Sequence, residues 1–180
     1  MTTFISILRG INVSGQKKIL MADLRALYEK LGFKNIQSYI QSGNVVFNYT
    51  EDKSNLAIAE MIEHAIEQEY EFQVPVLVKQ ADDLISTIKN NPFIDEAEAD
   101  PSRVAVTFLK SQPTSENLLK LEGVNFPPDR FIIDGLNIYI HCPVSYGNSK
   151  ISNNFFEKKL KVKATSRNWK TINMLAEMVG

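Results

Sequence analysis

The sequence predicts an α+β fold of two tandem ferredoxin-like halves, each with the element order βαββαβ, and an extra C-terminal helix. Strand-like and helical segments follow one another in an order that occurs twice. Each half has a hairpin turn, SGN at 42–44 in the first and DG at 134–135 in the second. We therefore expect halves at residues 1–91 and 103–180, joined by the acidic, proline-bounded linker 92–102.

The first half begins with a strand over residues 3–8, which is rich in strand-forming residues. A helix follows from about residue 20, and its apolar stripe has helical spacing: Leu24, Leu27, Tyr28 and Leu31. Gly32 is placed to end this helix in the left-handed conformation. Further segments complete the series: two strands around the 42–44 turn, a helix over 54–70, an edge strand in QVPVLVKQ and a connecting helix in ADDLISTIKNN.

The second half repeats this order without a clear repeat of individual residues. RVAVTFLK is a predicted strand, residues 114–121 a helix, and RFIIDGLNIYIHC a hairpin. ISNNFFEKKL is a predicted helix, KVKA a short strand and NWKTINMLAEM the closing helix.

Composition is that of a globular protein, with 44% hydrophobic and 23% charged residues. The single cysteine provides no disulfide framework and suits a reducing, cytoplasmic location. The sequence has no signal peptide and no apolar run of membrane-spanning length, which argues against a membrane partner. The net charge of −1 conceals an uneven layout, because residues 51–100 have a balance of −10 and residues 145–180 a balance of +5.

The segment RGINVSGQKK follows the first strand and contains three cations and no acid. In a ferredoxin-like sheet of order 4-1-3-2, the end of strand 1 lies beside the start of strand 3. The loop should therefore meet the 42–44 turn close to the start of the first helix, where free N–H groups favour anions. The predicted ligand-binding residues of this half are Arg9, Asn12, Lys17, Ser42 and Asn44.

A second polar cluster is predicted in the other half, where SYGNSK should approach TSRNWKT. Both stretches precede predicted helices, and Thr165 or Ser166 is expected to cap the last helix. The predicted ligand-binding residues here are Lys150, Thr165, Arg167 and Asn168. The sequence does not fix whether the two clusters form one cleft.

Other chemistries find no support in the sequence. His141 and Cys142 are neighbours in a strand, so their side chains point to opposite faces. Two histidines and one cysteine provide no metal cluster, and RGINVSGQKK lacks the spacing of a Walker loop. We predict no metal and no cofactor, and no catalytic residue can be named.

Three stretches together resemble a bacterial family, the domain-of-unknown-function family 1697. They are LRGINVSGQKKILMADLR, YIQSGNVVF and ATSRNWKTINML, and NPF and VTFL fit as well. The resemblance spans nearly the whole chain and implies two ferredoxin-like halves without implying any activity. Many members read GG where this chain has Ser14-Gly15, and Thr where it has Ser166, which retains a small residue and a hydroxyl.

The sequence favours a cytoplasmic protein that binds a small anionic, phosphate-bearing ligand through its polar loops. Nucleic acid is the less favoured partner, because NVVFNY lacks the basic-Gly-aromatic start of an RNA-binding RNP1 motif. A structural or interaction module without a small ligand is the remaining alternative. The sequence leaves open whether the protein is an enzyme and what its oligomeric state is.

Overall fold

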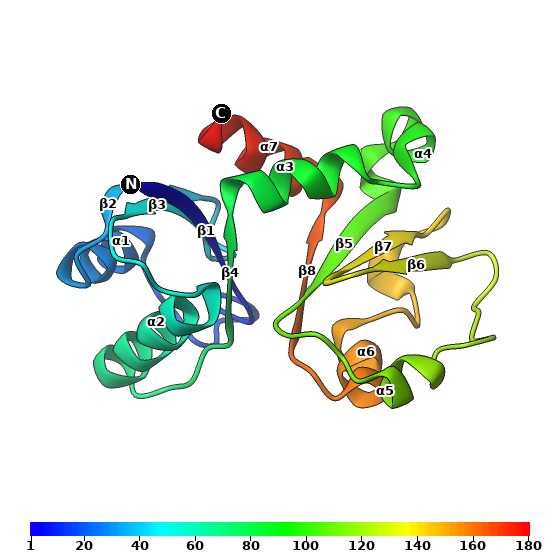
Figure 1. Cartoon of the computed structure of the whole chain (residues 1–180), viewed down its shortest axis with the longest axis horizontal. Helices are drawn as coiled ribbons and strands as arrows, with labels where there is room; N and C mark the ends of the chain where they lie inside the picture. Colours follow the sequence, from blue (N-terminus) through cyan, green and yellow to red (C-terminus); the bar gives the residue numbers. More distant parts are fainter. The chain divides into compact units, whose positions relative to one another are not determined.

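The computed structural model describes residues 1–180 and contains two four-stranded antiparallel sheets (Figure 1). The chain forms two compact units: unit 1 comprises residues 1–85 and 175–180, and unit 2 residues 86–174. The strand order is β2-β3-β1-β4 in one sheet and β6-β7-β5-β8 in the other. Both are the order expected for a ferredoxin-like sheet, so the predicted fold class is confirmed.

Unit 1 holds the first ferredoxin-like motif. Its elements are β1 (Thr2–Leu8), α1 (Met21–Lys30), β2 (Lys34–Tyr39), β3 (Asn44–Tyr49), α2 (Asn55–Tyr70) and β4 (Val76–Gln80), with α3 (Ala81–Lys89) directly after β4. β4 lies at the sheet edge, as Pro75 predicts, because proline cannot donate to a strand ladder. Gly32 ends α1 with a φ of 86°, and Phe33 N donates to Tyr28 O at 3.2 Å, which is the predicted helix end.

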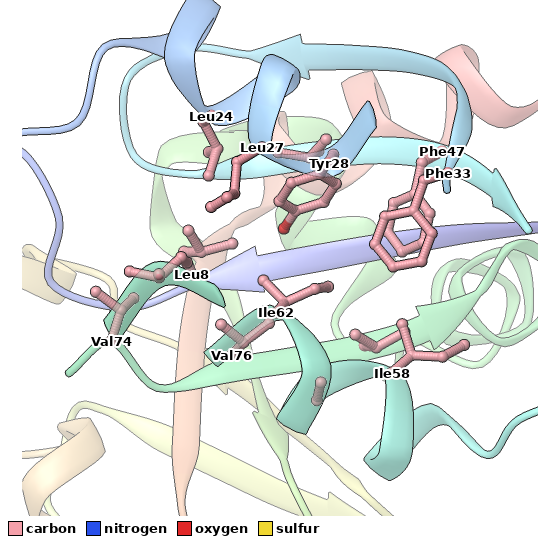
Figure 2. Packing of buried hydrophobic residues seen from close by; sticks show 14 of the residues in the cluster. Leu8, Leu24, Leu27, Tyr28, Phe33, Phe47, Ile58, Ile62, Val74 and Val76 are labelled. Atoms are coloured by element: carbon pink, nitrogen blue, oxygen red, sulfur yellow. The ribbon is translucent and has the colours of Figure 1, made fainter. Parts of the chain in front are cut away.

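Helices α1 and α2 cover one face of this sheet and share a core with it (Figure 2). Tyr28 and Ile62 point from the two helices toward β1, and Phe33 and Phe47 stack with ring centroids 4.4 Å apart. The Tyr28 hydroxyl and Ser6 Oγ lie 2.7 Å apart, which satisfies two polar groups inside the apolar core. This packing fixes the end of β1, from which the candidate site begins.

Unit 2 holds the second motif and its preceding segment. Its elements are α4 (Ile94–Ala99), η1 (Pro101–Arg103), β5 (Val104–Leu109), α5 (Ser115–Leu119), β6 (Arg130–Asp134), β7 (Asn137–His141), η2 (Tyr146–Asn148), α6 (Asn153–Leu160) and β8 (Ala164–Asn168), and α7 (Trp169–Val179) begins directly after β8. The stretch predicted as a linker, residues 92–102, thus contains a short helix and a 3-10 turn. Phe156 and Leu160 of α6 pack against Ile138 and Ile140 of β7 in the core of this unit.

The position of β8 differs from the sequence prediction. We expected the strand in KVKA, residues 161–164, and a capping loop in the residues after it. The strand instead runs over Ala164–Asn168, and every one of its residues pairs with β5. The polar residues Thr165, Ser166 and Arg167 are strand residues here, because the ladder satisfies their main chain and the side chains alternate between the two faces.

No helix of the protein combines the length and the apolar character needed to cross a membrane.

Candidate functional site

The loop after β1 meets the turn between β2 and β3, as predicted. Leu8 N donates to Gly43 O at 2.8 Å, and Asn12 Nδ2 donates to Gln41 O at 2.8 Å. Gly43 has a φ of +83°, and a Cβ atom at this position would lie 2.6 Å from Leu8 Cβ. Only glycine allows this close approach. We call Arg9–Lys18 the basic loop, and it is the centre of the candidate site.

The Asn12 side chain holds the basic loop in shape. Its Nδ2 also donates to Ile19 O at 2.9 Å, and its Oδ1 accepts from Ile19 N at 2.9 Å. Its backbone has a φ of 56°, a left-handed conformation that asparagine tolerates better than most residues. Both Nδ2 hydrogens are thus used within the protein. Asn12, predicted to bind a ligand, therefore acts as a positioning residue in this structure.

Asn44 and Ser42 are joined to each other within the neighbouring turn. Asn44 is fully buried, and its Nδ2 donates to Tyr39 O at 3.1 Å and to Ser42 Oγ at 2.9 Å. The bond to Tyr39 closes the connection between β2 and β3. Both predicted residues thus stabilise the turn against which the basic loop packs.

The three cations of the basic loop differ in their surroundings. Arg9 is half-buried, and its main-chain N donates to Pro75 O at 3.0 Å. Lys17 is exposed, and its Nζ donates to Gln73 O at 2.6 Å. Lys18 is exposed next to it. The first acid in the chain is Asp23, so no carboxylate within residues 1–22 neutralises these cations.

The four residues predicted as a second cluster do not converge on one point. Thr165 and Arg167 lie on one face of β8, whereas Asn168 lies on the other and Lys150 is exposed in the loop before α6. Asn168 Oδ1 accepts from Thr171 N at 2.8 Å, so Asn168 caps α7 in place of the predicted Thr165 or Ser166.

Arg167 occupies a largely desolvated position on its face of the sheet. Its Nη1 donates to Ser166 O at 2.9 Å, and desolvation lowers the pKa of its guanidinium to about 10. The side chain therefore remains a cation at neutral pH.

Sequence reasoning missed a network centred on Ser166. Its Oγ lies 2.5 Å from Thr107 Oγ1, accepts from the Tyr146 hydroxyl at 2.9 Å and donates to Asn153 Oδ1 at 2.6 Å. The predicted approach of SYGNSK to TSRNWKT is confirmed through Tyr146. The network joins β5, β8, η2 and the start of α6 and includes no acid or base, so it has the composition of a structural brace.

The sheet registers reveal a correspondence between the halves that the sequence does not display. Asn44 pairs with Ile7 of β1, and Asn137 pairs with Phe108 of β5 at the same place in the second sheet. Two residues earlier on the central strands, Ile5 pairs with Lys79 of β4, and Val106 pairs with Arg167 of β8.

Each half therefore has an asparagine at the start of its third strand and a cation on its fourth. Burial is the main cause that lowers the pKa of Lys79, and Asp83 opposes this effect. The same cause acts on Arg167.

The lone thiol has the environment of a packing residue. Cys142 is fully buried, and burial raises its pKa, so the reactive thiolate is disfavoured. Ser149 Oγ, beside it, donates to Asp129 Oδ2 at 2.6 Å. No three residues among the histidines, cysteines and acids lie close enough together to hold a metal ion.

Comparison with known proteins agrees with the resemblance seen in the sequence. The model of a family described as "Protein of unknown function (DUF1697)" matches residues 1–139. The chain belongs to this family. No curated protein matches the chain.

A solved structure has the same fold over its whole length. The conserved bacterial protein SP0830 from Streptococcus pneumoniae is 25% identical to this chain and superposes with a TM-score of 0.74. The similarity covers 99% of this chain and 99% of that chain. The two proteins therefore share a fold, and neither the family description nor the description of that protein names an activity.

Proposed function

We propose that this DUF1697 protein binds a phosphate-bearing ligand through the basic loop. The observation that carries the proposal is the exposed pair Lys17-Lys18 on a loop that contains no acid and is held by hydrogen bonds from Asn12 to the main chain of Ile19 and Gln41. Cationic donors form the stronger, charge-assisted class of hydrogen bonds with phosphate oxygens. The positive charges of Lys17 and Lys18 also favour the approach of an anion.

The fixed shape of the loop supports binding because less conformational freedom is lost when the ligand arrives. Asn12 contributes this shape, and the cations contribute the charge. The proposal assigns the site to unit 1 alone. In the predicted second cluster, Thr165 and Arg167 lie on one face of β8 and Asn168 on the other, while Lys150 lies in a separate loop. These residues form no comparable exposed group.

Isothermal titration calorimetry with inorganic pyrophosphate at low ionic strength tests the proposal. We expect Lys18→Glu to weaken binding about fivefold or more, because reversing one exposed charge changes the interaction by about 1 kcal/mol. Lys34→Glu is the matched control: it makes the same charge change at an exposed lysine at the far end of β2. Raising the salt concentration should weaken binding further.

Two results would contradict the proposal. One is the absence of any binding by the unmodified protein at millimolar pyrophosphate. The other is an equal loss in Lys18→Glu and Lys34→Glu, which would reflect net charge alone. Arg9→Ala distinguishes ligand binding by this residue from a purely structural role. Lower affinity for pyrophosphate with an unchanged melting temperature indicates ligand binding. A lower melting temperature with unchanged affinity indicates a structural role.

A further inference from the structure

Three exposed aliphatic residues lie in the basic loop, just after it, and beside the turn that the loop contacts. Val13 is 59% exposed, Leu20 71% and Ile40 51%. They are three of the five large hydrophobic side chains that unit 1 exposes, and Met1 and Leu56 are the others. Single exposed hydrophobic residues are ordinary on a protein surface, but a local group of them marks an interaction site.

The Asn12 hydrogen bonds place these three residues near one another. Asn12 is bonded to the main chain of Ile19 and Gln41. Val13, Leu20 and Ile40 each adjoin one of these three residues in the chain, and consecutive Cα atoms are about 3.8 Å apart. All three residues therefore lie one position along the chain from residues that meet at the Asn12 side chain.

Two of the three occupy positions where folding favours another residue type. Leu20 is the N-cap of α1 and makes no capping hydrogen bond, whereas Ser, Thr, Asp or Asn would stabilise the helix. Ile40 has a φ of 49°, a left-handed conformation that is costly for a β-branched residue. Exposed side chains that break local folding preferences without a packing gain point to function.

The chemistry of the group distinguishes between classes of partner. The basic loop, Leu20 and the 40–43 turn contain no aromatic residue. Single-stranded nucleic acid is usually bound by stacking on aromatic side chains, and protein interfaces are anchored by Trp, Tyr and Arg more than by Leu or Val. Aliphatic side chains next to lysines match a surface with phosphates outside and hydrocarbon beneath, which is an anionic phospholipid bilayer.

We infer that unit 1 binds the surface of an anionic phospholipid bilayer, with Lys17 and Lys18 at the phosphates and Val13, Leu20 and Ile40 in the interfacial layer. This inference rests on the proposed function and names its partner. The sequence argued against a membrane partner because it has no spanning segment, but surface binding needs only an apolar group and cations. A cytoplasmic location would place the basic loop opposite an anionic leaflet.

Co-sedimentation with vesicles of phosphatidylcholine alone, or with about 30% phosphatidylglycerol added to make the surface anionic, tests the inference. We expect at least tenfold tighter binding to the anionic vesicles. Leu20→Ser combined with Ile40→Asn should weaken that binding at least fivefold while the melting temperature stays the same or rises. Leu56→Ser removes another exposed leucine, 47% exposed on α2, and should change neither quantity.

The pyrophosphate titration separates this inference from the function on which it rests. Pyrophosphate binding without vesicle binding would overturn the bilayer as partner and leave the proposed function standing. Vesicle binding that the double variant retains would also overturn it, because charge alone would then account for adsorption. A single-stranded RNA would also overturn the inference if it displaced the protein from vesicles and bound the double variant as tightly as the unmodified protein.

Discussion

Replacing Asn12 with alanine should destabilise unit 1 through the loss of its three side-chain hydrogen bonds. Those bonds join Asn12 to Ile19 O, Ile19 N and Gln41 O, at 2.9, 2.9 and 2.8 Å. At about 1 kcal/mol of net stability each, their removal costs about 3 kcal/mol. In a chain of this length, that corresponds to a fall in melting temperature of about 6–12 °C.

Urea unfolding followed by far-ultraviolet circular dichroism measures this loss. Gln16→Ala is the control, because Gln16 is exposed in the same loop and should change the free energy of unfolding by no more than about 0.5 kcal/mol. Hydrogen exchange at the Ile19 amide should accelerate in Asn12→Ala alone. A loss below about 1 kcal/mol, or an equal loss in both variants, would refute the view that Asn12 holds the loop.

Three further predictions concern other parts of the fold. Gly43→Ala should lower the free energy of unfolding by about 2–4 kcal/mol, because the new Cβ atom would clash with Leu8 and the residue has a positive φ. Gly15→Ala is the control: it has open space around it and should lower the free energy of unfolding by only about 1 kcal/mol. Equal losses in the two variants would contradict the packing argument. Burial raises the pKa of Tyr28 above its unfolded value of about 10, so its stabilising contribution is complete below pH 10 and falls above it by about 1.4 kcal/mol per pH unit. Tyr28→Phe should therefore flatten the decline of stability above pH 10, and an unchanged decline would show that Tyr28 ionises freely. Cys142→Ser should leave pyrophosphate binding unchanged, and loss of binding in the folded variant would show that the thiol takes part in it.

Most of the fold could be predicted from the sequence because periodicity, turn residues and helix ends agreed with one another. The 42–44 and 134–135 turns fixed the two hairpins, and the order of elements then determined both sheets. β8 was misplaced because TSRN has the composition of a capping loop. Its strand conformation depends on pairing with β5, and no local property of these residues reveals that pairing.

The candidate site was predictable in position but not in the role of each residue. Topology alone brought the basic loop to the 42–44 turn. It could not reveal that Asn12 and Asn44 direct their amides at the main chain, because a side-chain orientation depends on packing around it. The correspondence of Lys79 with Arg167 was hidden for a similar reason, since it is a matter of sheet register and not of matching sequence.

The most direct test of the proposed function is a pyrophosphate titration of the ¹⁵N-labelled protein, followed by the chemical shifts of its backbone amides. We expect saturable shifts to concentrate in the basic loop, Arg9–Lys18, and in the adjoining 40–43 turn. The amide chemical shifts of β8 and of the loop around Lys150 should not change. Saturable shifts confined to unit 2, with the basic loop unaffected, would contradict the assignment of the anion site to unit 1.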